Sequence, residues 1–509
     1  MSLLTIGLAL LVLVAFFYLL RSRASRNRAK CKLIPGPSGF GCIKAFISGA
    51  RKNNLHVLAS TWAEKYGNVV RVRLFTQDIV YINDVRMVRH LFNSPALKEL
   101  TNDRPPTFIS KYVVYGDKSV AFTSRTAQQR VRRKLFHSVL KFYGENVARF
   151  EEIFMKSLNK LTGQMQLLNA VDLSQEISTA TLRVVDSLLA GEGSDNSGEK
   201  LATLAKFDAA FSDLFFFDNE TVLQPFPFLR FVPGLSFKSK YDDLIRARDN
   251  LVDAYFYDVK KTYVRGRERG VVDQLLTAQA TYEDGGNKDM LEDDVIKALL
   301  CETTIASFLT TSHAMNTLFL LVILHKEIQE KLYAEVKQVI GHDPPSLKHR
   351  GSMPYTEAAI LEVLRYATAG PFLLPHYCRD NVPLGEFTIQ KGAILLANVW
   401  YCHRREDQWE EPWTFKPDRF LDENGALVQA DHPLRQNLLV FGIGSRSCPG
   451  EAFARSRMFL IVVTLVKNFE FFALDGVPLP DPDPRSWKPN AVMGPGPYRC
   501  GIRPRSRSV

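Results

Sequence analysis

Cysteine is scarce in this chain of 509 residues, and its few copies are not arranged in pairs. There are seven cysteines, an odd number with no CxxC pattern, at positions 31, 42, 301, 378, 402, 448 and 500. Even numbers of closely spaced cysteines are typical of small secreted domains that depend on disulfides. The spacing here therefore argues against a disulfide framework and indicates a protein of a reducing compartment.

Several familiar modules are absent as well. The sequence has no recognised nucleic-acid motif, no flavin or nicotinamide module, no internal repeat and no linker long enough to divide its body. The formal net charge is +11, and the 65 basic and 54 acidic residues are spread along the chain. We therefore expect no nucleic-acid partner, and we attribute the charge to a membrane surface or an acidic protein partner. At 46% hydrophobic and 23% charged residues, the chain can bury a sizeable core.

Residues 3–20 carry no charge at all. As a helix they would be roughly 27 Å long at ~1.5 Å per residue, enough to cross the hydrocarbon core of a bilayer. No basic residue precedes them, whereas Arg21, Arg23, Arg26, Arg28, Lys30 and Lys32 follow. The positive-inside rule then predicts a single-pass membrane anchor over residues 1–20 and a cytosolic body. A cleaved signal peptide is the competing interpretation, but the apolar core is long for one and a basic n-region is missing.

Residues 21–37 are predicted to be a hinge between anchor and body. They combine the basic cluster with Pro35-Gly36-Pro37. Proline fixes its own backbone and restricts the residue before it, so this joint is expected to be stiff and non-helical.

The most informative stretch is Phe441-Gly-Ile-Gly444-Ser-Arg446-Ser-Cys448-Pro-Gly450. Gly444 and Gly450 allow sharp turns and a close approach of the backbone to a flat group. A helical run over 451–460 follows, so a helix N-terminus and loop amides point at the sulfur of Cys448 and favour its thiolate. Such a thiolate can be the axial ligand of a haem iron, and Arg446 can pair with a haem propionate. A buried structural cysteine beside a turn is the alternative.

This stretch resembles the haem-binding loop of the cytochrome P-450 superfamily, Phe-x-x-Gly-x-Arg-x-Cys-x-Gly, with every specified position filled. The resemblance implies a haem b cofactor with Cys448 as the iron ligand and with Phe441, Gly444, Arg446 and Gly450 as cofactor-binding residues. It also implies a mainly α fold with small β-sheets, in which residues 38–509 form one haem-thiolate catalytic domain behind the N-terminal transmembrane helix.

The pattern of the body fits that fold class. Residues 70–74 alternate with period two and 79–82 continue after a turn, which predicts a β-hairpin. Most of 125–340 is predicted to be helical, with polar loops at 191–199 and 282–290, and further strand signals lie at 384–399 and 491–503. Residues 207–237 carry nine phenylalanines. Ordinary core accounts for about half of them, and the family uses this region as an apolar lid that contacts the membrane.

Three more residues are similar to structural elements of the family. Glu362 and Arg365 are three apart on one predicted helix face and can pair. Arg419 follows in Pro417-Asp418-Arg419-Phe420, ahead of the cysteine loop. The resemblance implies that these side chains form a buried ion-pair network that fixes the loop, a structural role.

Two further residues are expected to bind haem propionates. His376 stands where microsomal relatives place a propionate ligand, although a lone histidine is often only a hydrogen-bonded core or surface group. Arg132 aligns with the arginine of the family's Trp-x-x-x-Arg, but Gln128 replaces the tryptophan, so Arg133 or Arg130 are alternatives. The same basic run, with Lys134, fits a docking face for an acidic electron donor; a plain solvated helix face is the other interpretation.

A long helix from Leu291 to His325 is predicted to activate oxygen. Gap-free alignment from both ends places residues 306–311 on the family's Ala-Gly-x-Asp/Glu-Thr-Thr, which delivers protons through an acid and an alcohol. Thr310 keeps the alcohol, Leu309 replaces the acid and Ser307 replaces the glycine. We take Thr310 and Ser307 as candidate catalytic residues. Glu302-Thr303-Thr304 reads like the motif but lies seven residues too early.

The resemblance, closest to animal microsomal enzymes, predicts a haem-thiolate monooxygenase of the endoplasmic reticulum membrane. It would insert one oxygen atom into a lipophilic small molecule such as a steroid, fatty acid or xenobiotic. Electrons would come from an NADPH–cytochrome P-450 reductase or a cytochrome b-type donor. The alternatives are a haem-thiolate isomerase or dehydratase acting on peroxides, and a haem-binding protein without turnover.

Overall fold

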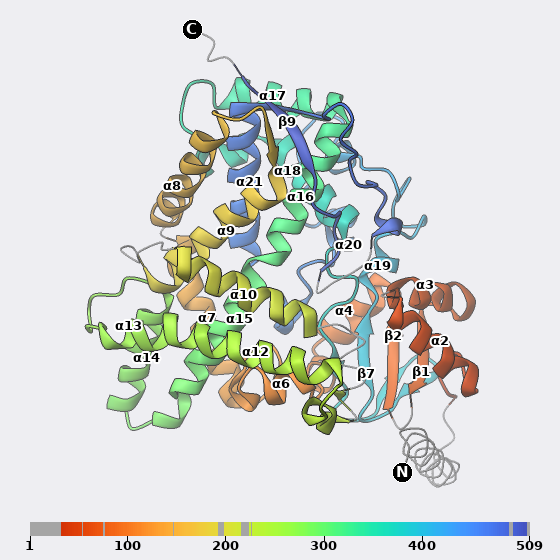
Figure 1. Ribbon diagram of the computed structural model, residues 1–509. Helices are drawn as coiled ribbons and strands as arrows, with labels where there is room; N and C mark the ends of the chain where they lie inside the picture. The colour runs from red at the N-terminus through yellow and green to blue at the C-terminus, as the bar shows by residue number, and fades with distance from the viewer. Residues whose placement is uncertain are drawn as a thin grey trace. The chain divides into compact units, whose positions relative to one another are not determined.

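The structure, a computed structural model, describes residues 32–505 apart from 53, 75–76, 146, 192–197, 215–222, 225 and 488–491 (Figure 1). Backbone contacts group these residues into two units: the described residues up to Pro105 with Phe372–Tyr401, and Pro106–Pro371 with the described residues from Cys402 onward. The predicted anchor over 1–20 and most of the hinge over 21–37 lie outside the described residues. One catalytic domain over 38–509 stays a prediction.

The smaller unit is built on a mixed sheet with strand order β1-β2-β7-β4. In β1 (Val69–Leu74) the valines are buried and the arginines between them are half-buried, so one face packs on the core. β1 and β2 (Gln77–Ile82) form the predicted antiparallel hairpin, and β2 pairs in parallel with β7 (Ile394–Ala397). The unit also contains α2 (Gly39–Arg51), α3 (Leu55–Tyr66), α4 (Val85–Asn93), α5 (Lys98–Thr101), β4 (His376–Tyr377), β5 (Val382–Leu384), β6 (Phe387–Ile389) and the start of α19 (Val399–Cys402).

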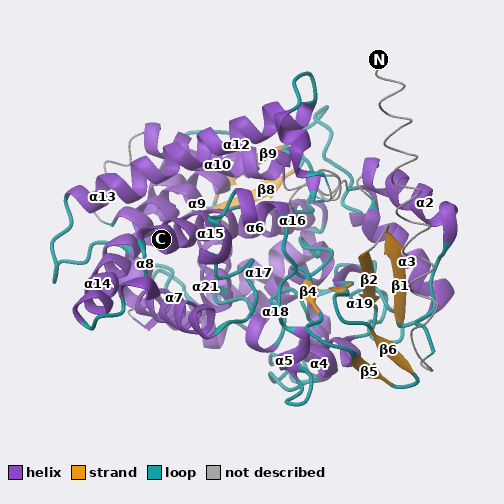
Figure 2. Cartoon of the chain, turned by 90° about the horizontal axis from the view of Figure 1, so that it is seen from below, coloured by secondary structure: helices purple, strands orange, loops and turns teal. Residues whose placement is uncertain are grey.

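The larger unit is mainly helical, as Figure 2 shows. Its helices are α6 (Phe108–Tyr112), α7 (Ala127–Glu145), α8 (Val147–Met165), α9 (Leu173–Ala190), α10 (Gly198–Leu214), α12 (Ser236–Val252), α13 (Asp258–Lys261), α14 (Val271–Asp284), α15 (Asp293–Ser307), α16 (Leu309–Leu324), α17 (Lys326–Val339), α18 (Pro354–Ala367), α20 (Pro433–Asn437) and α21 (Glu451–Asn468). A small antiparallel sheet, in the order β3-β9-β8, joins Ala170–Asp172, Arg499–Pro504 and Phe469–Phe472. A mainly α fold with small sheets is therefore confirmed.

Helix α16 belongs to the interior of this unit. Its residues from Ala314 to Val322 are all buried, which agrees with its apolar composition on every face. The segment Lys288–Leu324 is long and apolar enough to cross a membrane, yet 61% of its apolar window is buried inside the protein. We therefore assign it to the core, and it is distinct from the predicted N-terminal anchor.

The predicted helix from 291 to 325 is two helices rather than one. α15 ends at Ser307, α16 begins at Leu309, and Phe308 between them has φ −96° and ψ −68°. Neither proline nor glycine occurs at this break, so the sequence contains no ordinary signal for it. The short strands β3 and β8 were also not predicted.

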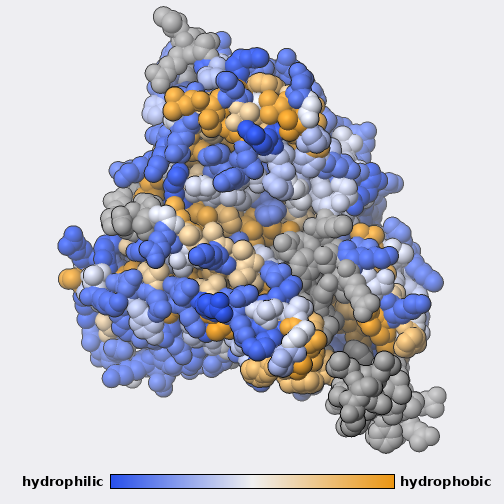
Figure 3. Space-filling view, in the orientation of Figure 1, coloured by the Kyte–Doolittle hydropathy of each residue, from blue (hydrophilic) through white to orange (hydrophobic). Residues whose placement is uncertain are grey.

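The phenylalanine-rich region is divided between core and surface. Phe207 and Phe211 of α10 are buried, whereas Phe228 and Phe231 are 51% and 62% exposed. Figure 3 shows apolar side chains on the surface at the lower edge of the view, beneath the end of α12. Phe215, Phe216 and Phe217 lie outside the described residues. The exposed pair is apolar surface suited to a membrane, and the predicted lid role stays a prediction.

We predict that Gly36→Ala destabilises the protein. Pro35 O accepts a hydrogen bond from Arg71 N at 2.9 Å, so the hinge lies against β1, and a Cβ on Gly36 would come within 1.9 Å of Arg71 O. Because backbone blocks the added methyl group, the segment must leave the strand at a cost of about 2 kcal/mol or more. Denaturant unfolding measures this loss. Gly41→Ala, whose Cβ meets nothing within 4 Å, is the control, and equal stability of the two variants would contradict the packing.

Candidate functional site

The cysteine loop turns twice before it reaches Cys448. Gly442 and Gly444 have φ of +69° and +64°, the left-handed region that side chains avoid. The loop is closed by a hydrogen bond of 2.6 Å from Cys448 N to Phe441 O. Gly450 caps α21 with φ −96°, and a Cβ there would lie 3.8 Å from Cys448 Sγ. The prediction of sharp turns is therefore confirmed at Gly444, with φ in the left-handed region, and at Gly450, which lies in the turn before α21; the turn at Gly442 was not predicted.

Cys448 is the one exposed cysteine among the free cysteines of the described residues. Even so, burial raises the pKa of its thiol, while the Gly450 N–H, Arg133 and Arg457 act in the opposite direction. The Gly450 N–H acts in the direction expected of the helix terminus and loop amides, although desolvation outweighs it. A bound metal deprotonates a coordinating thiol outright. An accessible thiol flanked by cations fits an iron ligand.

Of the three arginines considered for a propionate, one contacts the cysteine loop directly. Arg133 donates from Nη2 to Ser447 O. Arg132 is buried and donates to the carbonyls of Met290, Asp117 and Asp289 at 3.0, 3.1 and 3.3 Å. The structure therefore does not bring Arg132 to the loop. Arg130 is exposed.

Arg446 is buried within the loop and turned toward a neighbouring segment. Its guanidinium donates to Val120 O at 3.2 Å and to Thr123 O at 2.6 Å. The cation thus ties residues 120–123 to the cysteine loop. Its role as a propionate partner stays a prediction.

His376 lies in the smaller unit, on β4. Its ring stacks on Phe92 with centroids 3.8 Å apart, and Nδ1 donates to Thr101 O at 3.0 Å. The histidine is thus a well-packed core group, and its propionate role stays a prediction.

Glu302 of α15 is a buried acid whose importance was missed. Its carboxylate accepts hydrogen bonds from the Ser119 hydroxyl and from the N–H groups of Val120 and Ala121 at 3.2–3.3 Å. Burial raises the pKa of the Glu302 carboxyl to about 7, while these donors and Arg446 act in the opposite direction. The segment 119–123 is therefore held by its amides to Glu302 and by its carbonyls to Arg446.

The break between α15 and α16 is stabilised by side chains. The carbonyl of Ala306 accepts from Thr310 Oγ1 at 3.0 Å, that of Ser307 accepts from Arg457 Nη1 at 2.9 Å, and that of Leu309 accepts from His313 Nδ1 at 2.9 Å. Backbone acceptors at an interrupted helix need such partners. Neither Arg457 nor His313 was predicted.

The candidate catalytic residues surround this break. Thr310 is exposed, and Ser307 and Leu309 are half-buried. The break at Phe308 lies within residues 306–311 and is six residues beyond Glu302. Thr310 and Ser307 stay predicted catalytic residues.

The ion-pair network predicted from the resemblance is present. Arg365 binds both carboxylate oxygens of Glu362 at 2.7 and 2.8 Å, and Arg419 Nε binds the same carboxylate at 3.0 Å. Glu362 and Arg365 are fully buried. Arg365 also donates to the carbonyls of His403 and Pro412, so the network holds the segment that leads to the cysteine loop.

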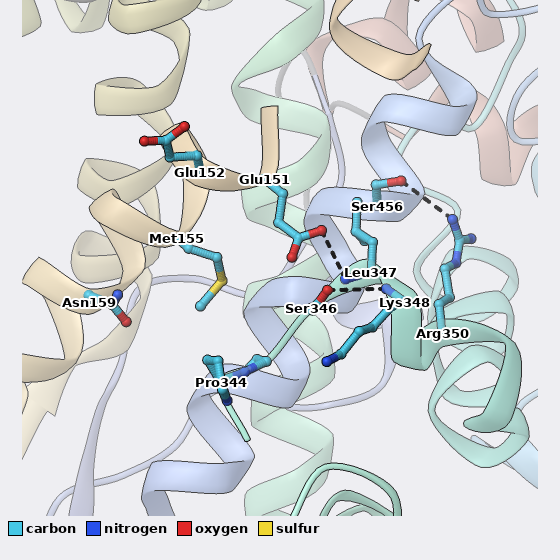
Figure 4. Close-up of a pocket in the computed structure, with 11 residues that line it drawn as sticks. Glu151, Glu152, Met155, Asn159, Pro344, Ser346, Leu347, Lys348, Arg350 and Ser456 are labelled. Atoms are coloured by element: carbon cyan, nitrogen blue, oxygen red, sulfur yellow. Dashed lines mark hydrogen bonds between the residues drawn. The ribbon is translucent and has the colours of Figure 1, made fainter. Parts of the chain in front are cut away.

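A separate pocket of about 910 Å³ opens between α8, the segment 344–350 and Ser456 of α21 (Figure 4). Some of its polar groups bind one another: Glu151 accepts from Leu347 N at 3.1 Å, and Arg350 donates to Ser456 Oγ at 3.4 Å. It does not contain the cysteine. Among the described residues, no group of three or more His, Cys, Asp or Glu side chains could hold a metal ion.

Comparison with known proteins identifies the family. The family model described as cytochrome P-450 matches residues 34–501. The steroid 17-alpha-hydroxylase/17,20 lyase of Ictalurus punctatus is 26% identical over 93% of this chain and 91% of its own length. The farnesoate epoxidase of Bombyx mori is 28% identical over 94% of this chain and 95% of its own length. A zebra fish cytochrome P-450 structure with progesterone shares the fold, with TM-score 0.76 and 24% identity over 88% of this chain and 99% of that chain.

We predict that Glu302→Gln changes how stability depends on pH. The pKa of Glu302 rises from an ordinary 4.5 to about 7 on folding, so its contribution is present below pH 4.5 and is lost as pH rises through about 7. At ~1.4 kcal/mol per pKa unit, the rise from 4.5 to about 7 makes this loss about 3.5 kcal/mol. The glutamine does not titrate, so the variant does not lose this stability. The free energy of unfolding of the variant should therefore increase relative to that of the wild type between pH 5 and 8.

Denaturant unfolding at each pH measures the difference. Glu423→Gln replaces an exposed carboxylate and is the control, with no comparable trend. A difference between Glu302→Gln and wild type that stays constant with pH would contradict the burial of an ionisable carboxyl at this position.

Proposed function

We propose the following function for this chain, which belongs to the cytochrome P-450 family: it inserts one oxygen atom into a lipophilic small molecule, with electrons from a separate NADPH-dependent reductase. The family and its fold carry a haem with a cysteine thiolate on the iron, and the chain is an oxidoreductase of the monooxygenase type. The observation that carries the proposal is the accessible thiol of Cys448 at the N-terminus of α21, flanked by arginines.

The residues around that thiol have the following proposed roles. Cys448 ligates the iron, and the haem, when bound, supplies the oxygen-activating chemistry. Phe441, Gly444 and Gly450 shape the loop beneath it. The propionates are assigned to Arg446 and His376 as predicted, with Arg133 taking precedence over Arg132 because its guanidinium already contacts the loop. Thr310 supplies an alcohol for proton delivery, and Ser307 supplements it.

The substrate is proposed to be lipophilic. The names of the relatives include a steroid hydroxylase and a farnesoate epoxidase, and both names denote action on largely apolar molecules. The exposed Phe228 and Phe231 give the chain an apolar surface from which such a molecule could be taken up. A steroid, a fatty acid or an apolar xenobiotic fits this description.

The setting is proposed to be the endoplasmic reticulum membrane, with a single-pass anchor over 1–20 and a cytosolic body. Exposed Arg130 and Lys134 of α7 lie four residues apart on one helix face. They suit the acidic surface of a reductase or a cytochrome b-type donor.

One observation favours a second candidate. Leu309 offers no carboxylate where the family places an acid, and a haem-thiolate isomerase or dehydratase that rearranges peroxides needs neither reductase nor dioxygen. Retained Thr310 favours the monooxygenase. Turnover of a lipophilic substrate that requires NADPH and reductase supports the monooxygenase, whereas turnover of a hydroperoxide without them supports the second candidate.

We predict that the ferrous–CO complex shows the red-shifted Soret band of thiolate ligation. Cys448→Ala removes the thiolate, so the band should disappear, whereas Cys402→Ala, at a buried cysteine, should keep it. Absorption spectroscopy of haem-loaded protein measures this, with circular dichroism to show that each variant is folded. A wild-type spectrum typical of histidine ligation would contradict the proposal.

We predict that the wild type releases much hydrogen peroxide for each NADPH consumed. Leu309 cannot supply a proton, and positioned proton donors typically contribute ~10²–10⁴-fold in rate. Leu309→Glu should lower the ratio of peroxide to NADPH, and Ser307→Ala should raise it. Leu309→Met, which keeps size and apolarity, is the control. If the wild type releases little hydrogen peroxide per NADPH, and this ratio is unchanged in all three variants, protons enter by another route.

A further inference from the structure

Arg457 is buried in the protein without an acidic partner. Its side chain lies on α21 and is 2% exposed, and in the described part of the chain no carboxylate binds it. Arg365 is equally buried but is bound by Glu362. A buried cation without an anion is costly, and burial lowers the pKa of Arg457 to about 9. A side chain maintained at such cost needs a compensating interaction.

The guanidinium reaches the interrupted helix. Nη1 donates to Ser307 O and Nη2 to Thr311 Oγ1, both at 2.9 Å. The group also lies over the ring of Phe453, 4.5 Å from its centroid, and Nε has no hydrogen-bond partner among the described residues. The two donors therefore bracket Phe308, with one partner on α15 and the other on α16.

The first of these bonds satisfies a carbonyl that the break exposes. The last carbonyls of a helix lack backbone donors and carry partial negative charge. Ser307 O is the last carbonyl of α15, and a cation is the favoured partner there. The break is therefore stabilised in this chain by a side chain from another helix.

Arg457 also contributes positive charge that acts on the cysteine. Cys448 interacts electrostatically with Arg457 and with Arg133, and the N-terminus of α21 points the positive end of the same helix at the loop. Positive charge next to a metal–thiolate unit stabilises the reduced state, which carries one more electron. When it ligates an iron, the Cys448 thiolate would also be an anion that acts favourably on the buried guanidinium.

We propose that Arg457 is a positioning residue that links the two sides of the haem site: its guanidinium holds the α15–α16 break, and its charge raises the reduction potential of the cysteine-bound iron. The inference rests on the proposed function in requiring a haem on Cys448. It goes beyond that function because it assigns two effects to Arg457 of α21. One is the reduction potential of the iron, and the other is the geometry of the break between α15 and α16.

Four variants separate the two roles. Arg457→Met and Arg457→Gln remove the charge, and an apolar replacement of a buried ion often folds well. Arg457→Lys keeps the charge. Thr311→Val keeps the charge and removes one of the two hydrogen bonds. Lys467→Met, in the last turn of the same helix, is the control for loss of a charge from α21 away from the loop.

The reduction potential of the haem-loaded full chain, measured by spectroelectrochemistry, is the first readout. Arg457→Met and Arg457→Gln should lower the equilibrium constant for reduction at least tenfold, which is ~59 mV for one electron. Arg457→Lys, Thr311→Val and Lys467→Met should stay within about twofold of wild type. Peroxide released per NADPH is the second readout, and it should rise severalfold in Thr311→Val because the break loses one of its two bonds to Arg457.

The outcomes distinguish this inference from the proposed function. A wild-type ferrous–CO spectrum without the thiolate band overturns the function and the inference together. With that band present, an unchanged reduction potential in Arg457→Met and Arg457→Gln overturns the electrostatic role. That role is also overturned if Arg457→Lys lowers the reduction potential as much as Arg457→Met does. Unchanged coupling in Thr311→Val overturns the positioning role.

Discussion

The larger unit depends on one buried carboxylate that two guanidinium groups share. Glu362 is fully buried and binds Arg365 and Arg419. Such a cluster adds little net stability, because desolvation offsets the attraction, but breaking it is costly. Its strict geometry decides where the surrounding backbone runs: Arg365 donates to the carbonyls of His403, Pro412 and Thr414. The segment 403–420 therefore has one position relative to α18.

His403 connects this ion-pair cluster to the cysteine loop. Burial and the neighbouring Arg404 and Arg365 hold the pKa of His403 well below its usual value, so the ring is neutral. Its Nε2 accepts from Leu439 N at 3.0 Å, and Nδ1 donates to Thr368 Oγ1 at 3.0 Å. A neutral imidazole can serve one donor and one acceptor in this way. Leu439 lies two residues before Phe441, where the loop begins, so the ion network acts on the loop through one histidine.

Local patterns predicted much of this, and long-range pairs account for what was missed. The cysteine loop, the β1–β2 hairpin and the Glu362–Arg365 pair are each contained in a short stretch. Glu302 and Arg457 find their partners 183 and 150 residues away, and no spacing rule indicates that. Which of Arg130, Arg132 and Arg133 contacts the cysteine loop was left open for a related reason. Neighbours on a helix point about 100° apart, so residue type alone cannot tell which one faces the loop.

The helix break shows most clearly how the two sides of the site depend on each other. An apolar pattern runs through Phe308 without proline or glycine, and by itself it favours a continuous helix. The break persists because three side chains take up the carbonyls around it: Thr310 and His313 from α16, and Arg457 from α21. Two of these are local, and the third belongs to the helix that follows Cys448. One of the carbonyls at the break thus takes its donor from a cation 150 residues away in the sequence, and the same cation acts electrostatically on the sulfur of Cys448. Arg457 therefore contributes both to the hydrogen bonding of the break and to the charge that acts on Cys448.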